Sequence, residues 1–240
     1  MNIKHKIRNV FRKSGYDITK YNKVILTPAP LKQLLFSNNI STFLDVGANN
    51  GEFAEQIRKE LGYTNKIISF EPLSSAFRLL KEKAASDPNW EVFNFALGEN
   101  YEKRDINIAG NSYSSSLLEM LPEHQKVAPE SKYVGKELIE IYKLDDIFNE
   151  LCIPSDKIYM KIDAQGFERM ILKGAEKTLK SISHLQLEMS FVPLYDGEIL
   201  FDEMYSFLHD KDFKMIAIEP GFKDKITGQL LQVDGFFQRY

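Results

Sequence analysis

The chain has 240 residues, of which 43% are hydrophobic and 27% charged, and its formal net charge is −3. This length and composition predict one large globular domain, and the single cysteine excludes an internal disulfide framework and a multi-cysteine zinc site. The near-neutral charge argues against general nucleic-acid binding. No apolar run reaches the roughly 18 residues of a membrane span, and no apolar run of signal-peptide type follows the basic N-terminus, so we expect a cytoplasmic protein.

Residues 1–40 predict a helical extension in front of the main domain. Within it, residues 2–13 have the pattern of a short basic amphipathic helix, with apolar residues on one face and lysines and arginines around the rest. Such a helix either docks on the core or on a second subunit of a homodimer, or it binds an anionic substrate or a membrane surface. A second short helix is expected at 31–36.

From residue 42 onward, short apolar runs alternate with helical patterns. Strands are expected at 42–46, 66–70, 91–95, 158–162, 184–189, 213–218 and 235–239. Helices are expected at 52–61, 74–85, 168–179 and 201–208. This alternation predicts an α/β fold, a Rossmann-like doubly wound and mostly parallel sheet with helices on both faces. Ligands of such sheets bind beyond the carboxyl ends of the strands, where the strand order reverses.

Residues 99–157 break the alternation after the third strand. They contain two strand-like segments, 104–108 and 138–142, and we interpret them as an insertion within a domain that spans 41–240. The hydroxyls and the aromatic ring of 111–116 suit recognition of a polyhydroxy acceptor, although they suit any solvated loop equally. His124, in the same insertion, is the histidine with the best chance of reaching a site; the alternative is an ordinary surface position.

A glycine-rich turn, Asp45-Val-Gly-Ala-Asn-Asn-Gly51, follows the first strand and opens a helix. Gly47 and Gly51 allow close approach of the backbone to a ligand, and the helix start offers free N–H groups. Asn49 stands where a dinucleotide fingerprint has glycine, and the Gly-Lys-Ser/Thr of a Walker loop is absent. Asp45 would repel a phosphate but suits a ligand with an ammonium group.

An acidic residue, Glu71, follows the second strand, where a carboxylate can accept hydrogen bonds from both hydroxyls of a ribose. The glycine turn and this acid together fit a nucleoside without phosphates, and S-adenosylmethionine is such a ligand. The alternative is that Gly51 is an ordinary turn and Glu71 a helix cap. After the third strand, a backbone N–H could meet the edge of the adenine, with Leu97 packed on its ring. The predicted donor contacts are Asp45, Gly47, Asn49, Gly51, Glu71, Ala96 and Leu97.

The stretch 44–51 resembles the first motif of class I S-adenosylmethionine-dependent methyltransferases, and further segments resemble the FkbM family in particular. These segments are 69–72, 96–98, 144–146, 161–168, 172–175, 187–188, 193–195 and 228–234. The resemblance covers about residues 40–240, and Lys161-Ile-Asp-Ala-Gln-Gly-Phe-Glu168 is its most specific part. It implies a seven-stranded sheet whose last strand is antiparallel. It also implies transfer of a methyl group, commonly to a hydroxyl of a sugar, a glycan or a natural product.

Methyl transfer from a sulfonium is an in-line displacement in which a hydroxyl acceptor must lose a proton. Asp163 follows the fourth strand on the ligand edge, so we predict that it is the base or the ligand of a divalent ion with the same effect; capping the next helix is the alternative. Lys161 shares its strand face, and a buried lysine must be paired, with Glu168 or Glu188 as candidate partners. If Lys161 is instead functional, we expect it to orient Asp163 or to hold an acceptor. Glu188 is either that partner or a second active-site carboxylate.

The sequence therefore predicts a methyltransferase that uses S-adenosylmethionine to methylate a hydroxyl of a sugar, a glycan or a small metabolite. The predicted catalytic residues are Asp163, Lys161 and Glu188. A divalent metal is compatible with this set but is not indicated. N-methylation of a small molecule, a nicotinamide oxidoreductase and a non-catalytic donor-binding scaffold are the alternatives. Asn49 argues against the second, and three acidic residues on one sheet edge argue against the third.

Overall fold

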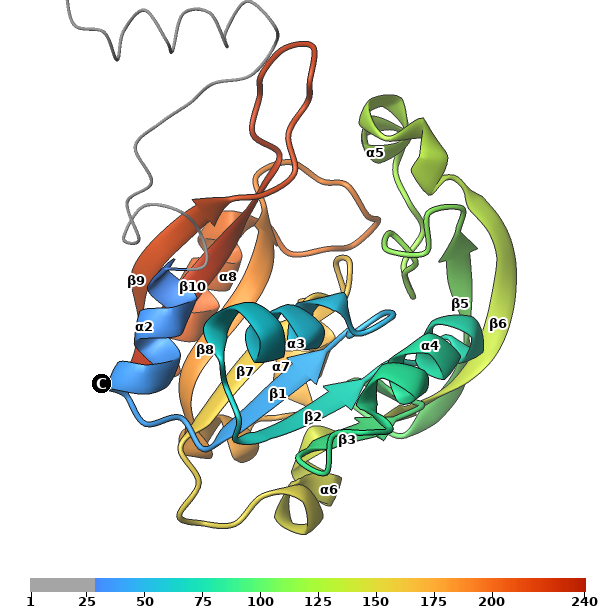
Figure 1. Cartoon of the computed structure of the whole chain (residues 1–240). Coiled ribbons are helices and arrows are strands. Elements are labelled where there is room, and N and C mark those ends of the chain that lie inside the picture. Colours follow the sequence, from blue (N-terminus) through green and yellow to red (C-terminus); the bar gives the residue numbers. More distant parts are fainter. Residues whose placement is uncertain (1–28) are drawn as a thin grey trace, which may run out of the picture.

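In the computed structural model, residues 29–240 are described, and they form a seven-stranded sheet covered by helices on both faces (Figure 1). The predicted helix at 2–13, with its membrane or dimer contact, lies outside the described residues. Across the sheet the strands are β3 (Trp90–Phe93), β2 (Lys66–Phe70), β1 (Thr42–Val46), β7 (Ile158–Ile162), β8 (Ile182–Ser190), β10 (Gln232–Arg239) and β9 (Phe213–Pro220). β10 runs antiparallel to both of its neighbours, and the other pairs are parallel. The predicted fold class is confirmed.

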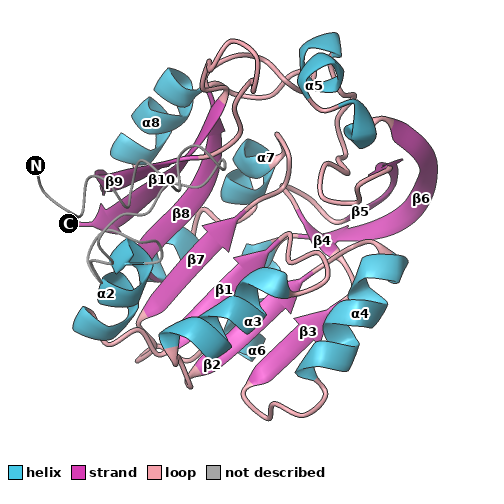
Figure 2. Ribbon diagram, turned by 45° about the horizontal axis from the view of Figure 1, so that its top comes forward, coloured by secondary structure: helices cyan, strands magenta, loops and turns pink. Residues whose placement is uncertain are grey.

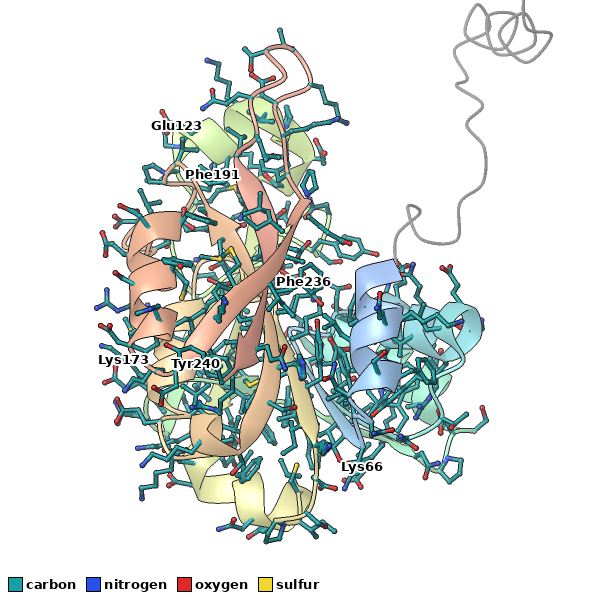
Figure 3. The ribbon with its side chains drawn as sticks, turned by 90° about the vertical axis from the view of Figure 1, so that its left-hand side faces the viewer. Lys66, Glu123, Lys173, Phe191, Phe236 and Tyr240 are labelled. Carbon is teal, nitrogen blue, oxygen red and sulfur yellow. The ribbon has the colours of Figure 1, made fainter. Side chains whose placement is uncertain are left out.

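The two faces of the sheet carry separate hydrophobic clusters, because successive side chains of a strand point to opposite sides. Phe43 and Ile67 pack on the face covered by α2 (Ala29–Ser37), α3 (Glu52–Gln56) and α4 (Ser74–Ala84). Leu44 and Ile68 pack on the other face. That face is covered by α6 (Leu144–Leu151), α7 (Glu168–Lys173) and α8 (Phe201–His209) (Figure 2). The side view shows Phe236 of β10 toward α2 (Figure 3).

The seven predicted strands of the main sheet are all present, with ends within three residues of the expected ones, but several helices differ from the prediction. The expected helix at 52–61 is α-helical only to Gln56 and continues as a π-helix over Ile57–Leu61, and the short helix at Pro122–Val127 was not predicted. The expected helix at 168–179 ends at Lys173, and beyond this end the Asp145 carboxylate accepts hydrogen bonds from the N–H groups of Lys177 and Thr178. The helix α6 was not predicted, although Leu144, Ile147, Phe148 and Leu151 have the 3.6-residue apolar spacing.

Two strands of the insertion form, together with β4 just before it, a second, three-stranded sheet of order β4-β6-β5. Its strands are β4 (Ala96–Leu97), β5 (Glu102–Ala109) and β6 (Tyr133–Tyr142), with the short helix α5 (Pro122–Val127) between the last two. β5 and β6 pair antiparallel along their whole length, and β6 curves around one side of the molecule (Figure 2). The loop between β5 and α5 thereby reaches the carboxyl edge of the main sheet, where it closes the site described below.

Among residues 29–240, no helix combines the length and the apolar character that crossing a membrane requires.

Candidate active site

A cavity opens at the carboxyl edge of the main sheet, between β1 and β7. The chain leaves β1 toward β2 on one side, while β7 lies on the other side, so this is the point where the strand order reverses. The cavity holds about 750 Å³ of empty space, part of it open to solvent. Its walls come from the turns after β1, β2 and β7, from β4 and from the inserted loop.

The glycine turn reaches the cavity through Gly47 and Asn49, but not through Gly51. Gly47 has φ +81°, and a Cβ there would lie 1.8 Å from the carbonyl oxygen of Asp163. Glycine is thus required at position 47 because the backbone there passes close to the turn after β7. Gly51 has φ +79°, and its missing Cβ faces Leu80 and Trp90 on the underside. Gly51 therefore serves the conformation of the turn and the packing of the helix, and it does not line the cavity.

Asp45 lies beneath the turn, fully buried and outside the cavity wall. Its register neighbours on the two adjacent strands are Ser69 and Lys161. Oδ2 accepts a hydrogen bond of 3.1 Å from the Ser69 hydroxyl, while Oδ1 has no partner among the described residues. Burial raises the pKa of Asp45, against the opposing effects of the Lys161 charge and the Ser69 hydrogen bond. Because Asp45 does not line the cavity, it can act on the site only through its neighbours Ser69 and Lys161.

Glu71 forms part of the cavity wall and is only 4% exposed. Its Oε2 accepts a hydrogen bond of 2.8 Å from the N–H of Asn49, and its Oε1 accepts one of 2.8 Å from the N–H of Leu73. Asn49 turns its N–H to the carboxylate by adopting φ +46°. Burial raises the pKa of Glu71 to about 7, although these two N–H groups act in the opposite direction. Each carboxylate oxygen keeps a lone pair for a ligand hydroxyl.

The opposite side of the cavity combines apolar side chains with the inserted loop. Ala96 and Leu97 form part of the wall, as their predicted role requires. Ser112 and Tyr113 also reach the cavity, and they join the loop to the glycine turn. The Ser112 hydroxyl lies 3.4 Å from the Asn49 amide, and the Tyr113 hydroxyl donates to Glu52 Oε2 at 2.9 Å. The sequence marked this loop by its hydroxyls and its aromatic ring, but not by its contacts with the glycine turn.

Asp163 follows β7 directly, and its side chain forms part of the cavity wall with 39% of its surface exposed. Oδ2 accepts from Lys161 Nζ at 3.0 Å, and Oδ1 accepts from the Gln165 amide at 2.9 Å. Burial opposes ionisation, but the Lys161 charge and these hydrogen bonds outweigh it and lower the pKa of Asp163. The group is an ionised carboxylate that faces the cavity.

Lys161 is buried, as expected, but its expected partners were wrong. Its ammonium pairs with Asp163 and lies 4.8 Å from the centre of the Phe53 ring. Glu168 instead accepts hydrogen bonds from the N–H groups of Ala164 and Gly166, and so holds the turn after β7. The N-cap position of α7 is Phe167, so neither carboxylate caps this helix, and Asp163 remains directed to the cavity.

Glu188 of β8 lies behind the cavity wall. Its Oε2 accepts hydrogen bonds from the amides of Gln165, at 3.1 Å, and Gln232, at 2.8 Å. Burial raises the pKa of Glu188 well above its usual value, and the neighbouring charge of Asp163 acts in the same direction. The same burial therefore favours the protonated form of Glu188, beside an Asp163 whose pKa is lowered.

His124 does not reach the cavity and is not a surface residue either. It is 3% exposed and packs against Tyr195 and Phe222, with ring centres 5.2 Å apart in both pairs. Within the part of the chain that the structure describes, no group of three or more His, Cys, Asp or Glu side chains is arranged to hold a metal ion.

A seven-stranded sheet with this strand order and a cavity at its reversal point has the α/β fold of methyltransferases. The family model described as "Methyltransferase FkbM domain" matches residues 45–215, and the chain therefore belongs to the FkbM methyltransferase family. No curated protein sequence matches the chain.

Several solved structures are similar to this chain at low sequence identity. The methyltransferase FkbM from Methylobacillus flagellatus KT is 15% identical with a TM-score of 0.53; the match covers 86% of this chain and 47% of that protein, so this chain spans about half its length. An rRNA methylase from Streptococcus thermophilus is 10% identical with a TM-score of 0.48, covering 90% and 98%. Fibrillarin from Aeropyrum pernix, natively bound to S-adenosyl-L-methionine, is 8% identical with a TM-score of 0.47, covering 82% and 66%.

Proposed function

We propose that this protein is an S-adenosylmethionine-dependent O-methyltransferase that acts on a hydroxyl of a sugar, a glycan or a small metabolite. The observation that carries the proposal is the buried carboxylate of Glu71 in the wall of a cavity that also receives the glycine turn and Asp163. A carboxylate at this point is suited to accept hydrogen bonds from the free hydroxyls of a ribose.

The residues of the cavity fit such a donor. Glu71 offers one free lone pair on each oxygen for the two ribose hydroxyls, and Leu97 offers an apolar surface for the adenine. Gly47 and Asn49 present backbone at the reversal point, where the amino-acid end of the donor would lie. The donor, when bound, supplies an electrophilic methyl group on a positively charged sulfur.

Asp163 supports transfer to oxygen rather than to nitrogen. A hydroxyl must lose its proton as the new bond to carbon forms, and general-base help requires a carboxylate within hydrogen-bond reach. The Asp163 carboxylate is ionised, faces the cavity and can accept a proton. The Lys161 ammonium keeps the partly exposed carboxylate ionised, and so lowers its basicity while fixing its position.

Calorimetric titration with S-adenosylmethionine, S-adenosylhomocysteine and NAD tests the proposal directly. We expect binding of the first two only, and a loss of about 100-fold or more in Glu71→Ala, because two charge-assisted hydrogen bonds disappear. Glu82→Ala is the matched control, since Glu82 is an exposed carboxylate on α4. Binding of NAD alone, or unchanged affinity in Glu71→Ala, would overturn the assignment. Binding of the donor without transfer to any acceptor in a screen of glycans and nucleotide sugars would favour the scaffold.

The raised pKa of Glu71 makes donor binding depend on pH. The carboxylate is ionised above about pH 7, and only this form accepts both ribose hydroxyls, so affinity should fall as the pH falls below that value. Between pH 8 and pH 6 the dissociation constant should rise by about tenfold, in proportion to the lost ionised fraction. Glu71→Gln should remove this component and leave only the titration of the donor itself. Titrations of both proteins at pH 6, 7 and 8 measure the difference; parallel curves would contradict it.

A further inference from the structure

Gln165 occupies a central place in the turn after β7 that the sequence did not reveal. It forms part of the cavity wall and has φ +53°, a left-handed conformation that is uncommon for residues other than glycine. Asn49 and Ser112, which share this backbone conformation, are also at the cavity. Strained backbone of this kind persists only where surrounding contacts hold it, and such positions concentrate at functional sites.

The side-chain amide of Gln165 joins three groups from different elements. Its Nε2 donates to Asp163 Oδ1 at 2.9 Å and to Glu188 Oε2 at 3.1 Å. Its Oε1 accepts from the Tyr195 hydroxyl at 2.7 Å. The backbone carbonyl of Gln165 also accepts a hydrogen bond of 2.7 Å from the Ser116 hydroxyl. Both ends of the residue are therefore fixed.

The orientation of this amide follows from its neighbours. The NH₂ group has two hydrogens, one for each carboxyl group, and the oxygen suits the tyrosine hydroxyl. A rotation of the amide by half a turn would direct its oxygen at two carboxyl groups and leave both without this donor. Tyr195 is itself fully buried, and its hydroxyl lies 3.3 Å from the carbonyl of Ser114 in the inserted loop.

We propose that Gln165 is a positioning residue for Asp163, and that its amide, anchored by Tyr195, holds the Asp163 carboxylate at the cavity while separating it from Glu188. The proposal rests on the proposed function, in which Asp163 takes the proton of the acceptor. Gln165 touches no reacting atom in this role; it acts through the aspartate.

The charges around the two carboxyl groups agree with this division. Lys161 pairs with Asp163 and not with Glu188, and the groups that face Glu188 are Asp163, Glu168 and Asp234, with Lys161 as the cation. Gln165 is the one neutral donor that the structure gives to both carboxyl groups within its described part. Two interacting carboxyl groups in unequal surroundings divide into a base and a proton holder. Through its hydrogen bonds, Gln165 helps to make Asp163 the base and Glu188 the group that holds a proton.

Titration of the ¹³C-labelled carboxyl groups by NMR tests the inference without any ligand, with assignments taken from Asp163→Asn and Glu188→Gln. In Gln165→Met, which keeps the length and volume of the side chain, we expect the apparent midpoint of Asp163 to rise by about one pH unit, the effect of one lost charge-assisted hydrogen bond. Gln232→Met is the matched control, because Gln232 donates to Glu188 but not to Asp163. It should shift the midpoint of Glu188 and leave that of Asp163 in place.

Tyr195→Phe provides the second variant, since it removes the hydroxyl that anchors the Gln165 amide and keeps the buried ring. It should move the Asp163 midpoint in the same direction as Gln165→Met and by a smaller amount. An Asp163 midpoint that stays unchanged in Gln165→Met, or that shifts equally in Gln232→Met, would overturn the proposal. These titrations do not involve the methyl donor, so a failure here is distinguishable from a protein that fails to bind S-adenosylmethionine.

Discussion

Asp163→Asn is expected to lower methyl transfer to a hydroxyl acceptor by about 100- to 10,000-fold, the usual contribution of a positioned general base. The asparagine keeps the size of the side chain and an oxygen that can accept from Lys161, but it cannot take a proton. The carboxylate is the only acidic side chain of the described cavity wall besides Glu71, which has its own two backbone partners. No neighbouring group in that wall can therefore replace it.

The measurement compares initial rates with radiolabelled donor, together with the affinity for the donor by calorimetry. Donor affinity should change little, because the ribose contact belongs to Glu71. Glu168→Gln is a useful comparison: Glu168 supports the turn from below and is 4% exposed, so it should affect stability more than the pH profile of transfer. Full turnover in Asp163→Asn would remove the base and favour transfer to nitrogen, which requires no such group.

The fold could be predicted from the sequence because its signals are local. Each buried strand of the main sheet is a short apolar run, and the helices between them repeat their apolar residues with helical spacing. The second sheet was harder to predict, since β4 has only two residues and β5 begins with four exposed ones. Its existence depends on pairing with β6, about 40 residues along the chain, and such a contact leaves no local pattern.

The site was predictable as far as strand ends determine it. Glu71 and Asp163 follow β2 and β7 directly, and parallel strands bring their carboxyl ends to one edge. What the pattern could not show is the direction of each side chain within a turn. Asp45 and Gly51 belong to the same motif as Gly47, yet they face the interior beneath the turn.

Partners of buried polar groups were the least predictable feature. Lys161 was expected to pair with a glutamate, but its partner is Asp163, two residues further along the chain. Gln165 lies within the segment 161–168, but the sequence does not show what its side chain contacts, because β8 and the turn before α8 bring Glu188 and Tyr195 to it only in the fold. Such contacts are decided by packing between distant segments.

Gly47→Ala is the second substitution with a large expected effect. Two costs combine: a left-handed conformation, which costs an alanine about 1–2 kcal/mol, and overpacking against the Asp163 carbonyl, which typically costs about 1–3 kcal/mol. The alanine methyl group would lie 1.8 Å from this carbonyl oxygen, which belongs to the backbone, so relief requires β1 and β7 to separate at the cavity. We therefore expect both a lower free energy of unfolding and a loss of donor binding.

Gly62→Ala separates these two costs. Gly62 has φ +73°, close to that of Gly47, but a methyl group there would meet no atom within 4 Å. This variant should therefore lose only the contribution of the backbone conformation, about 1–2 kcal/mol, and it should bind the donor normally. Urea unfolding of both variants measures the difference, which isolates the contact between the two turns. Equal losses of unfolding free energy would mean that the turn after β7 can move away from the added methyl group without destabilising the protein. Glycine at position 47 would then be needed for its backbone conformation alone.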